Sequence, residues 1–333
     1  MIDTLLSRLL SAPDSPTADL YFRNACGDLL GSQVRQIAPT VFLSDEACLV
    51  MRHAMRSGPL PQGRRLIYML DDDVDAGVAD MSLPFLYRQK LRMVERPAGK
   101  DLVRRADIAV VSSPLLEEML SRHLETHLMM PYWSEGLAPL DHFDRAVLPG
   151  GRFEIAYLGS FAHRSDLQFL LPVLANLLAR FETVHVHVPQ RHALPSPFDL
   201  HPRVHRIPGL GWTEYRTRLT ERRFHVALYP LLDTPFNRAR SPNKLIEHAV
   251  VGAAPIYSAE WRETERIVHG ASGLCLPNTQ HAWVDAIAAL IRAPERARHL
   301  AEGARAVARR LNDPGPQRAL WRQLLGVQER SVA

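Results

Sequence analysis

The sequence has few cysteines and few aromatic residues. Its three cysteines, Cys26, Cys48 and Cys275, lie far apart and show no Cys-x-x-Cys spacing. This pattern argues against a disulfide scaffold or a zinc site, and it favours a reducing compartment. Aromatic residues make up 7% of the chain, and the positive charge is nearly all arginine that is not interleaved with them. We therefore expect no nucleic-acid partner.

Long hydrophobic runs are also missing. No stretch approaches the ~18 uninterrupted apolar residues that a transmembrane helix needs. The first sixteen residues contain an acid at Asp3 and too short an apolar stretch for a signal peptide. We therefore expect a cytoplasmic protein, with at most peripheral contact at the inner face of a membrane. The amphipathic stretch 88–105 is the candidate for such contact, although Pro97 and Gly99 interrupt it and a solvated helix face explains it more simply.

Several motifs of catalysis and metal binding are absent too. The chain contains no Gly-x-Ser-x-Gly element, P-loop or Gly-x-Gly-x-x-Gly motif. His185 and His187 alternate on a predicted strand and so share one face, but the sequence places no third ligand beside them. We therefore expect no metal site.

The remaining composition is that of an ordinary globular protein, with 46% hydrophobic and 23% charged residues. A chain of 333 residues is long enough for two domains. The formal charge of +4 is unevenly placed: residues 1–150 hold 16 Lys and Arg against 20 Asp and Glu, and the remainder holds 24 against 16. A basic second half fits an anionic ligand such as a nucleotide diphosphate.

Strand-like and helix-like segments alternate along both halves of the chain, which predicts an α/β fold with two doubly wound, Rossmann-like domains facing across a cleft. We place the domains at 1–148 and 149–312, with 133–150 as the linker and a last helix within 313–333 that can cross back to the first domain. Strands are predicted at 40–43, 65–70, 108–112, 129–132, 153–158, 183–188, 203–207, 226–229 and from 253 onward. Helices are predicted at 44–57, 86–105, 114–124, 166–181, 212–220, 243–251, 283–291, 295–311 and 317–328.

The segment 224–258 is the most informative part of the chain. An apolar strand is followed by a polar loop that contains Asn237, Arg238, Arg240 and Ser241, and then by a helix that starts at Asn243. Because unpaired backbone N–H groups and the helix dipole favour negative charge at a helix start, this arrangement predicts an anion site.

Two charged residues of that helix, Lys244 and Glu247, are three positions apart and so share one face. A surface salt bridge explains the pair simply. Alternatively, the lysine contacts a phosphate and the glutamate accepts hydrogen bonds from ribose hydroxyls, which the neighbouring strand ends favour.

A second candidate for phosphate contact is the turn after the first strand of the second domain. It contains Gly159, Ser160, His163 and Arg164. Glycine lets a backbone approach a phosphate, and the histidine and arginine can neutralise its charge.

These segments resemble the donor-binding signature of GT-B glycosyltransferases, the group that includes glycosyltransferase families 1 and 4. In that signature a lysine precedes the glutamate that holds the ribose of a sugar nucleotide, and Ala, Gly and Pro follow. The matching positions here are Lys244, Glu247, Ala249, Gly252, Pro255 and Ile256. The run Tyr-Leu-Gly-Ser with His-x-x-Asp after it resembles the loop that faces the diphosphate in the same enzymes.

The resemblance implies a hexosyltransferase-like enzyme of polysaccharide or glycoconjugate biosynthesis that needs neither metal nor cofactor. It would move a sugar from a nucleotide-sugar donor, bound by the second domain, to a carbohydrate, lipid-linked or protein acceptor on the side of the first domain. Family 4 enzymes retain configuration. The implied donor-binding residues are Gly159, Ser160, His163, Asn237, Ser241, Asn243 and Glu247, with Trp212 and Tyr215 beside the base. The implied catalytic residues are Arg164, Arg238 and Lys244, which would stabilise the departing diphosphate, and Asp73 on the acceptor side.

The sequence departs from the signature at one position. The family usually carries a second glutamate, which contacts the donor sugar, eight residues before the ribose-binding one. This chain has Ala239 there. The identity of the sugar and the stereochemical outcome therefore stay open.

Three alternatives also stay open. Asp71, Asp72 and Asp73 follow a predicted strand directly. A D-x-D motif formed by Asp71 and Asp73 would hold a metal ion in a GT-A enzyme, whereas in a GT-B enzyme Asp72 or Asp73 would face the acceptor. The alanine at the glutamate position would also suit a non-catalytic sugar-nucleotide-binding or partner subunit. A GT-B epimerase that acts on the sugar nucleotide itself is the third alternative.

Overall fold

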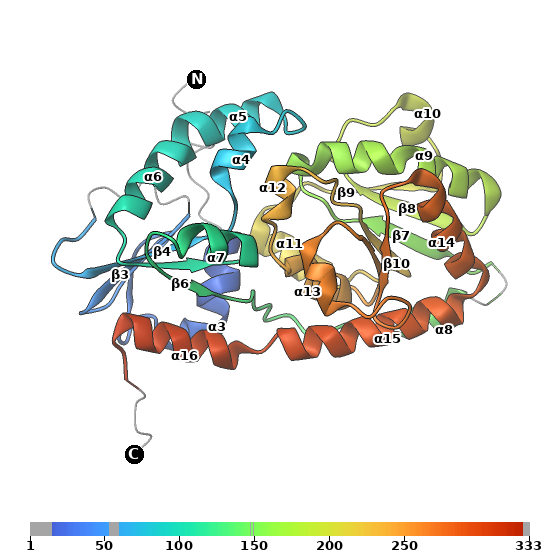
Figure 1. The fold of residues 1–333 in the computed structure, drawn as a ribbon. Coiled ribbons are helices and arrows are strands. Elements are labelled where there is room, and N and C mark those ends of the chain that lie inside the picture. Colours follow the sequence, from blue (N-terminus) through green and yellow to red (C-terminus); the bar gives the residue numbers. More distant parts are fainter. Residues whose placement is uncertain (1–14, 53–59, 147, 149, 329–333) are drawn as a thin grey trace, which may run out of the picture.

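The computed structural model describes residues 15–52, 60–146, 148 and 150–328. The predicted absence of a signal peptide concerns residues that lie outside these ranges. Two six-stranded sheets lie side by side, each covered by helices, as Figure 1 shows. This is the predicted α/β architecture with two Rossmann-like halves.

The first sheet has the strand order β1-β2-β3-β4-β5-β6. Its first three strands are antiparallel, and β3 to β6 are parallel. The strands are β1 (Arg35–Ala38), β2 (Val41–Leu43), β3 (Ala47–Met51), β4 (Arg65–Leu70), β5 (Ile108–Val111) and β6 (Glu125–Leu128).

Helices cover both faces of this sheet. They are α2 (Pro16–Ala18), η1 (Asp19–Arg23), α3 (Asn24–Cys26), η2 (Gly27–Leu29), α4 (Val74–Ala79), α5 (Phe85–Lys90), η3 (Leu91–Glu95), α6 (Arg96–Arg105) and α7 (Pro114–Leu120). On one face Leu102 of α6 packs against Leu66 and Tyr68 of β4. On the other face Phe22 packs against Phe42, with ring centroids 4.7 Å apart.

The second sheet is fully parallel and has the order β12-β11-β10-β7-β8-β9. Its strands are β7 (Phe153–Tyr157), β8 (Val184–Pro189), β9 (Val204–Ile207), β10 (Val226–Tyr229), β11 (Ala254–Ser258) and β12 (Leu274–Leu276). The helices of this half are α8 (His142–Ala146), η4 (Phe161–His163), α9 (Arg164–Arg180), α10 (Ser196–Asp199), α11 (Trp212–Thr220), α12 (Pro235–Arg238), α13 (Asn243–Val250), η5 (Arg262–Arg266), α14 (Gln280–Arg292) and α15 (Pro294–Leu311).

The last helix, α16 (Pro314–Leu325), returns to the first half. In Figure 1 α15 and α16 run one after the other beneath both sheets. Trp321 of α16 is fully buried, and its Nε1 donates to the backbone oxygen of Tyr21 at 2.5 Å. The hydroxyl of Ser44 donates to the oxygen of Leu325 at 2.7 Å. These contacts attach the C-terminal helix to the first sheet.

Three expectations about local structure are wrong. The predicted helix 44–57 contains the strand β3, because Ala47–Met51 is buried on both faces and pairs with β2 and β4; residues 53–57 lie outside the described ranges. The predicted strand 129–132 is displaced, since pairing with β5 ends at Leu128. The linker 133–150 contains the helix α8, which packs Phe143 into the core of the second half.

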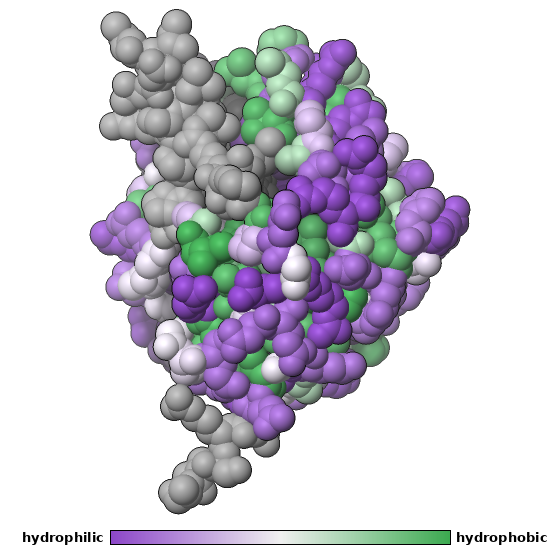
Figure 2. Space-filling model, turned by 90° about the vertical axis from the view of Figure 1, so that its left-hand side faces the viewer, coloured by the Kyte–Doolittle hydropathy of each residue, from purple (hydrophilic) through white to green (hydrophobic). Residues whose placement is uncertain are grey.

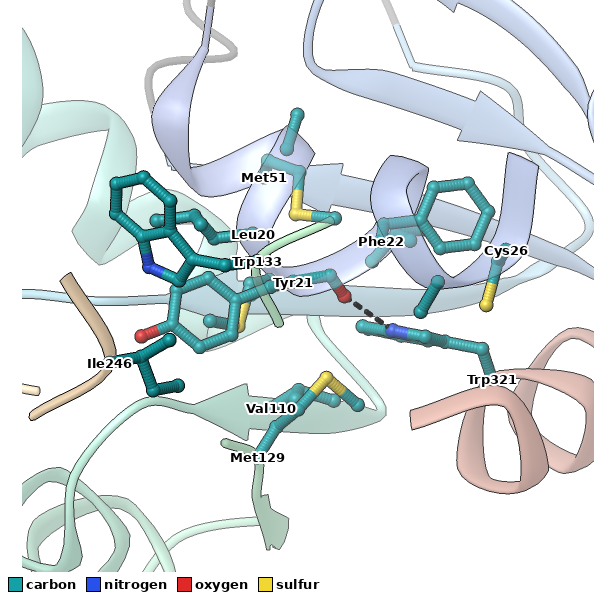
Figure 3. Close-up of a cluster of buried hydrophobic side chains, with 14 of the residues drawn as sticks. Leu20, Tyr21, Phe22, Cys26, Met51, Val110, Met129, Trp133, Ile246 and Trp321 are labelled. Carbon is teal, nitrogen blue, oxygen red and sulfur yellow. Dashed lines mark hydrogen bonds between the residues drawn. The ribbon is translucent and has the colours of Figure 1, made fainter. Parts of the chain in front are cut away.

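The position of the boundary at 148 stays a prediction. It falls between the two sheets, after a helix that already packs on the second one. An apolar cluster, drawn in Figure 3, joins the halves: it combines Tyr21, Met51 and Val110 with Ile246 of α13. Within the described ranges, no helix has the length and apolar character of a bilayer-spanning segment.

Candidate functional site

The strand order of the second sheet indicates where a ligand fits. The order reverses between β7 and β10, which are neighbours in the sheet but far apart in the chain. In open parallel sheets, ligands bind in the crevice outside the carboxyl ends of the strands at such a reversal. The turn 158–163 follows β7 and the loop 230–242 follows β10, so both predicted anion-binding segments lie at this point.

Lys244 and Glu247 form the centre of the site on the second domain. Glu247 is buried, with 2% exposure, and each of its carboxylate oxygens has a partner. One oxygen accepts from the hydroxyl of Tyr215 and the other from Lys244 Nζ. Lys244 Nζ also donates to the backbone oxygen of Leu158 at 2.7 Å. The predicted pair is therefore an ion pair around a buried carboxylate and not a surface salt bridge.

Tyr215 is half-buried beside this carboxylate. Burial, together with the negative charge of Glu247, raises the pKa of its phenol well above the usual value. Because the phenol stays protonated, it remains a donor to the glutamate. Its ring stacks on Trp212 with centroids 6.1 Å apart, so the two predicted aromatic residues do lie together beside Glu247.

The turn after β7 is held tightly by its neighbours. A side chain at Gly159 would place its Cβ 2.0 Å from the hydroxyl of Tyr157, which donates to the oxygen of His163 at 2.8 Å. This close approach, and not a positive φ, explains the glycine. The ring of His163 contacts Asp166 through Nδ1 at 3.0 Å, and Asp166 accepts from the backbone N–H of Leu232 at 3.0 Å.

The tautomer of His163 follows from its two partners. A guanidinium has no acceptor, so Arg240 donates to Nε2 of the histidine, and Nδ1 carries the proton that goes to Asp166. Burial lowers the pKa of His163, and the charge of Arg240 lowers it further. The ring is therefore neutral at neutral pH.

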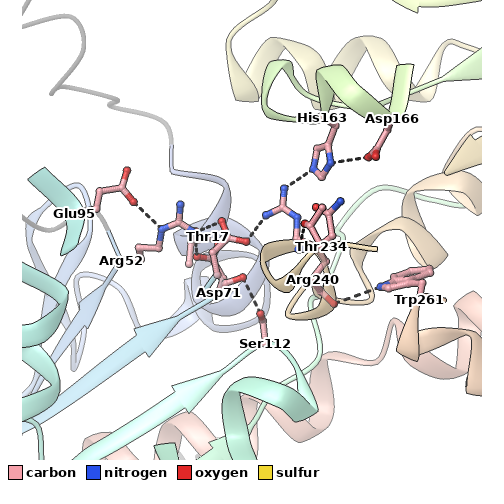
Figure 4. Close-up of polar contacts among 12 residues, drawn as sticks. Thr17, Arg52, Asp71, Glu95, Ser112, His163, Asp166, Thr234, Arg240 and Trp261 are labelled. Carbon is pink, nitrogen blue, oxygen red and sulfur yellow. Dashed lines mark hydrogen bonds and ion pairs between the residues drawn. The ribbon is translucent and has the colours of Figure 1, made fainter. Parts of the chain in front are cut away.

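A chain of charged side chains crosses from one domain to the other, as Figure 4 shows. Arg240, in the loop before α13, pairs with Asp72 after β4. Asp72 also pairs with the buried Arg52, which contacts Asp71 at 2.9 Å and Glu95 at 3.1 Å. Burial alone would raise the pKa of Asp72, but Arg240 and Arg52 outweigh it and hold that pKa at about 2.

Two further polar contacts join the domains near the same helix. Trp133 Nε1 donates to Oδ1 of Asn243 at 2.6 Å. Trp212 Nε1 donates to Asp19 at 2.8 Å, and Arg216 pairs with the same carboxylate at 3.0 Å. Asn243 and Trp212 were predicted as donor-binding residues, and the structure places both at the domain interface.

The remaining predicted residues of the basic loop differ in their surroundings. Arg238 is exposed at the end of α12, and Asp233 holds it through two hydrogen bonds of 2.7 and 2.8 Å. Asn237 is buried inside the loop, where it donates to the oxygen of Leu232 at 2.8 Å. Ser241 is half-buried at the start of α13. Their roles toward a ligand stay predictions.

Two other predicted residues lie at helix starts. Arg164, the first residue of α9, is exposed. Asp73 caps α4 by accepting from the N–H of Ala76 at 2.9 Å, and burial raises the pKa of its carboxyl. The aspartate that faces the second domain is Asp72. In the part of the chain that the structure describes, no group of three or more His, Cys, Asp or Glu side chains is arranged to hold a metal ion.

Ala239 does not face the site. It is fully buried and packs against Ala109, Val111 and Leu116 of the first domain. The position that carries a sugar-contacting glutamate in the resembling family therefore serves here as an apolar contact between domains.

Sequence reasoning placed Arg240 in the predicted anion-binding loop without giving it a role, and it did not name Arg52 or Tyr21. Arg240 is 168 residues from Asp72 in the chain, so no local pattern could pair them. The hydroxyl of Tyr21 is buried at the domain interface, near the side chains of Ser112 and Ser241. The feature of the sequence that pointed to Arg240 was its position in the basic loop, two residues after Arg238.

Comparison with solved structures identifies the architecture. Sucrose-phosphate synthase of Thermosynechococcus elongatus superposes with a TM-score of 0.59 at 16% sequence identity, over 84% of this chain and 74% of that one. The chain has a GT-B fold. Other GT-B proteins match it as well. Anabaena HepE, solved in complex with UDP and glucose, gives a TM-score of 0.54 at 16% identity, over 80% of this chain and 72% of that one.

TarM of S. aureus gives a TM-score of 0.59 at 8% identity and covers 83% of this GT-B chain, which spans 54% of the length of TarM. No protein-family model and no curated protein matches the sequence. At these identities the structural matches establish the fold of the chain and leave its chemistry to be argued from the site.

Proposed function

We propose that this protein is a glycosyltransferase that moves a sugar from a nucleotide-sugar donor to an acceptor. The observation that carries the proposal is the cluster of Lys244 and Tyr215 around the buried Glu247, at the topological reversal of a GT-B fold. HepE, a structure with the same fold, is in complex with UDP and glucose, so a uridine diphosphate sugar is the first donor to test.

Each residue of the cluster has a role in this proposal. The ribose hydroxyls replace Tyr215 or Lys244 as partners of Glu247, whose two oxygens can each accept a hydrogen bond. Lys244 then turns toward the diphosphate, next to the turn 158–163 that it already contacts. Positive charge aimed at the departing diphosphate lowers the barrier where negative charge develops.

We propose further that the reaction needs no metal and retains configuration, with the leaving phosphate taking the acceptor proton. Lys244 supplies positive charge beside the turn 158–163 without a divalent ion. Transfer should therefore persist in EDTA, whereas abolition by EDTA and recovery with Mn²⁺ would contradict metal independence. The configuration of the product at its new glycosidic bond, measured by NMR, checks the stereochemistry.

A thermal-shift screen against UDP, GDP, ADP, dTDP and CMP tests donor binding. A ligand at ~100-fold over its Kd that binds only the folded protein adds about 2.7 kcal/mol of stability, which such a screen detects. Stabilisation by none of these nucleotides would overturn the proposal. Binding without transfer or hydrolysis of a radiolabelled sugar nucleotide, across donors and acceptors, would indicate a non-catalytic subunit instead. A product that still carries the nucleotide would indicate an epimerase.

We also propose that the enzyme works in the cytoplasm and contacts anionic lipid through the first domain, where a lipid-linked acceptor would reach the cleft. Phe85, Leu86 and Met93 are 63%, 80% and 72% exposed on one helical stretch, with Arg88 and Arg92 beside them. Figure 2 shows hydrophobic residues at the top of this domain, at the height at which Figure 1 places α5.

Binding to vesicles tests the lipid contact. We expect co-sedimentation with vesicles that contain phosphatidylglycerol and little with phosphatidylcholine alone, because the apolar side chains insert while the arginines attract negative headgroups. The double variant Phe85→Ser with Leu86→Ser should lose it. The matched control is Leu200→Ser, which changes an apolar residue of 79% exposure on the second domain. Equal binding by both variants would contradict the contact.

A further inference from the structure

Arg240 is a charged residue of the second domain that contacts the first domain. Its side chain is 17% exposed, and the guanidinium contacts Asp72 on one side and His163 on the other. The same group lies over the ring of Phe236, 4.8 Å from its centroid. Arg240 therefore touches the acceptor-side domain and the donor-side turn at once.

Asp72 keeps a counter-ion in the first domain when this arginine leaves. Asp72 is also paired with Arg52, whose side chain is 5% exposed. Among the described residues, the ion-paired cluster around Arg52 contains the carboxylates of Asp71, Asp72 and Glu95 and the cations Arg52 and Lys90. The cluster carries one net negative charge, and this single charge is what the arginine of the second domain neutralises.

The turn 158–163, on the donor side, lies between two cations. Lys244 reaches it at Leu158, and Arg240 reaches it at His163. A diphosphate at this turn would therefore meet a flexible ammonium on one side and, on the other, a guanidinium, whose planar fork suits two phosphate oxygens. The buried hydroxyl of Tyr21 also lies at the domain interface and points toward Ile246 of α13 in Figure 3.

We propose that Arg240 is a diphosphate ligand that stays paired with Asp72 until a diphosphate binds. In the ligand-free protein the arginine pairs with Asp72 across the domain interface, and it moves to the diphosphate when a nucleoside diphosphate binds at the turn 158–163. The proposal rests on the proposed function, because it requires that turn to bind a diphosphate. It gives Arg240 the diphosphate-binding role that the sequence analysis gave to Arg238.

The transfer couples the two substrates. Once the arginine has moved, Asp72 keeps Arg52 as its counter-ion and loses the partner that covered its other oxygen, Oδ1. The freed oxygen faces the second domain and can accept a hydrogen bond from an acceptor hydroxyl. Donor binding therefore prepares the acceptor side, and the order of binding is donor first.

The test compares the affinity for UDP and for inorganic pyrophosphate, measured by calorimetry. Arg240→Ala should weaken both by roughly tenfold or more, because it removes a charged hydrogen-bonding partner. Asp72→Asn should tighten both by about three- to tenfold, because it removes the competing anion. The matched controls are Arg298→Ala and Asp144→Asn, whose residues form an exposed ion pair of 2.5 Å on the second domain. Neither control should change the affinity for UDP or for pyrophosphate.

The signs of the two effects decide the outcome. A salt bridge that merely stabilised the fold would make both variants bind more weakly or leave both unchanged, and either result would overturn the proposal. If the wild-type protein bound neither pyrophosphate nor any nucleotide, the proposed function itself would fail. If it bound them while Arg240→Ala bound equally well, only the present inference would fail.

A measurement on the wild-type protein covers the case in which Asp72→Asn does not fold. The Nε–H signal of Arg240, assigned by its absence from the Arg240→Lys spectrum, should shift as pyrophosphate saturates the protein. The signal of Arg52, which keeps its partners, should shift far less. Saturation that leaves the Arg240 signal in place would overturn the proposal.

Discussion

Trp133 donates its indole N–H to the side-chain oxygen of Asn243 at 2.6 Å, and the hydrogen bond joins the two halves of the fold. Trp133 is 1% exposed and also contacts Trp212 edge to face, with ring centroids 5.5 Å apart. Asn243 is the first residue of α13, the helix that carries Lys244 and Glu247. The start of α13 is thus positioned from the other domain.

Asn243→Ala should therefore lower the free energy of unfolding by about 1 to 3 kcal/mol, since it leaves a buried indole N–H without a partner. Urea unfolding followed by tryptophan fluorescence measures this loss. In a double-mutant cycle, Trp133→Phe removes the donor, so the loss from Asn243→Ala should shrink in that background. Losses that simply add would show that the hydrogen bond does not couple the two residues.

Lys244→Ala should lose most of the stabilisation that a bound nucleotide gives. The lysine supplies the positive charge beside the turn 158–163, and its removal also leaves one oxygen of the buried Glu247 unpaired. The thermal shift with saturating UDP, compared with the shift of the wild type, measures the effect. A full shift in this variant would contradict the phosphate role of the lysine.

Asp73→Ala should behave differently from Lys244→Ala. It removes the N-cap of α4, so the unfolding free energy should fall by about 1 kcal/mol. The thermal shift with UDP should be kept, because the cap lies on the first domain. If the variant instead keeps its stability and loses the nucleotide shift, Asp73 belongs to the donor site.

Protonation of His225 should lower the stability of the protein as the pH falls. The N–H of Glu154 donates to Nδ1 of this buried ring at 2.9 Å, so the structure holds the neutral form. Burial, assisted by His142, lowers the pKa of His225 to about 4. The folded-state pKa lies below the unfolded value of about 6.5. The neutral ring of His225 therefore contributes fully to the unfolding free energy above pH 6.5, and this contribution is lost as the pH falls toward 4.

Between pH 7 and pH 4 this histidine should account for a loss of about 3 kcal/mol in unfolding free energy. His225→Gln, which can still accept from the backbone, should show a shallower pH dependence in urea unfolding than the wild type. The matched control is His299→Gln on the exposed face of α15, which should keep the wild-type slope. Equal slopes for all three proteins would refute the assignment.

Trp321→Ala should lower the unfolding free energy by about 3 to 5 kcal/mol, as large-to-small changes of buried aromatic residues do. The ring lies edge to face with Phe22, with centroids 5.7 Å apart, and is fully buried between α16 and the first sheet. Urea unfolding measures the loss. A change below 1 kcal/mol would mean that α16 contributes little to the first domain.

The second half of the fold was predictable because its signals are local. Strands such as β10 and β11 are short apolar runs, and the predicted helix 212–220 has the bounds of α11. The first half was harder. Its strand β3 is apolar on both faces and was predicted as a helix, because a uniformly apolar run carries no periodicity that separates strand from helix.

The candidate site divides in the same way. Lys244 and Glu247 could be found from their spacing, because neighbours three apart on a helix share a face. The choice between Arg238 and Arg240 could not be made, since it depends on where α12 ends and on an aspartate in the other domain. Contacts between domains form only when the two sheets are brought together, and no local pattern encodes them.

The return of α16 to the first sheet has a consequence for biosynthesis. The ribosome completes the first sheet early, yet the partners of Tyr21 and Ser44 on α16 are translated 300 and 281 residues after them. The N-terminal half must wait with part of its apolar face uncovered while the second half, whose strands are contiguous in the chain, can already fold. We therefore expect the nascent protein to depend on chaperones that shield the first sheet until the final helix leaves the exit tunnel.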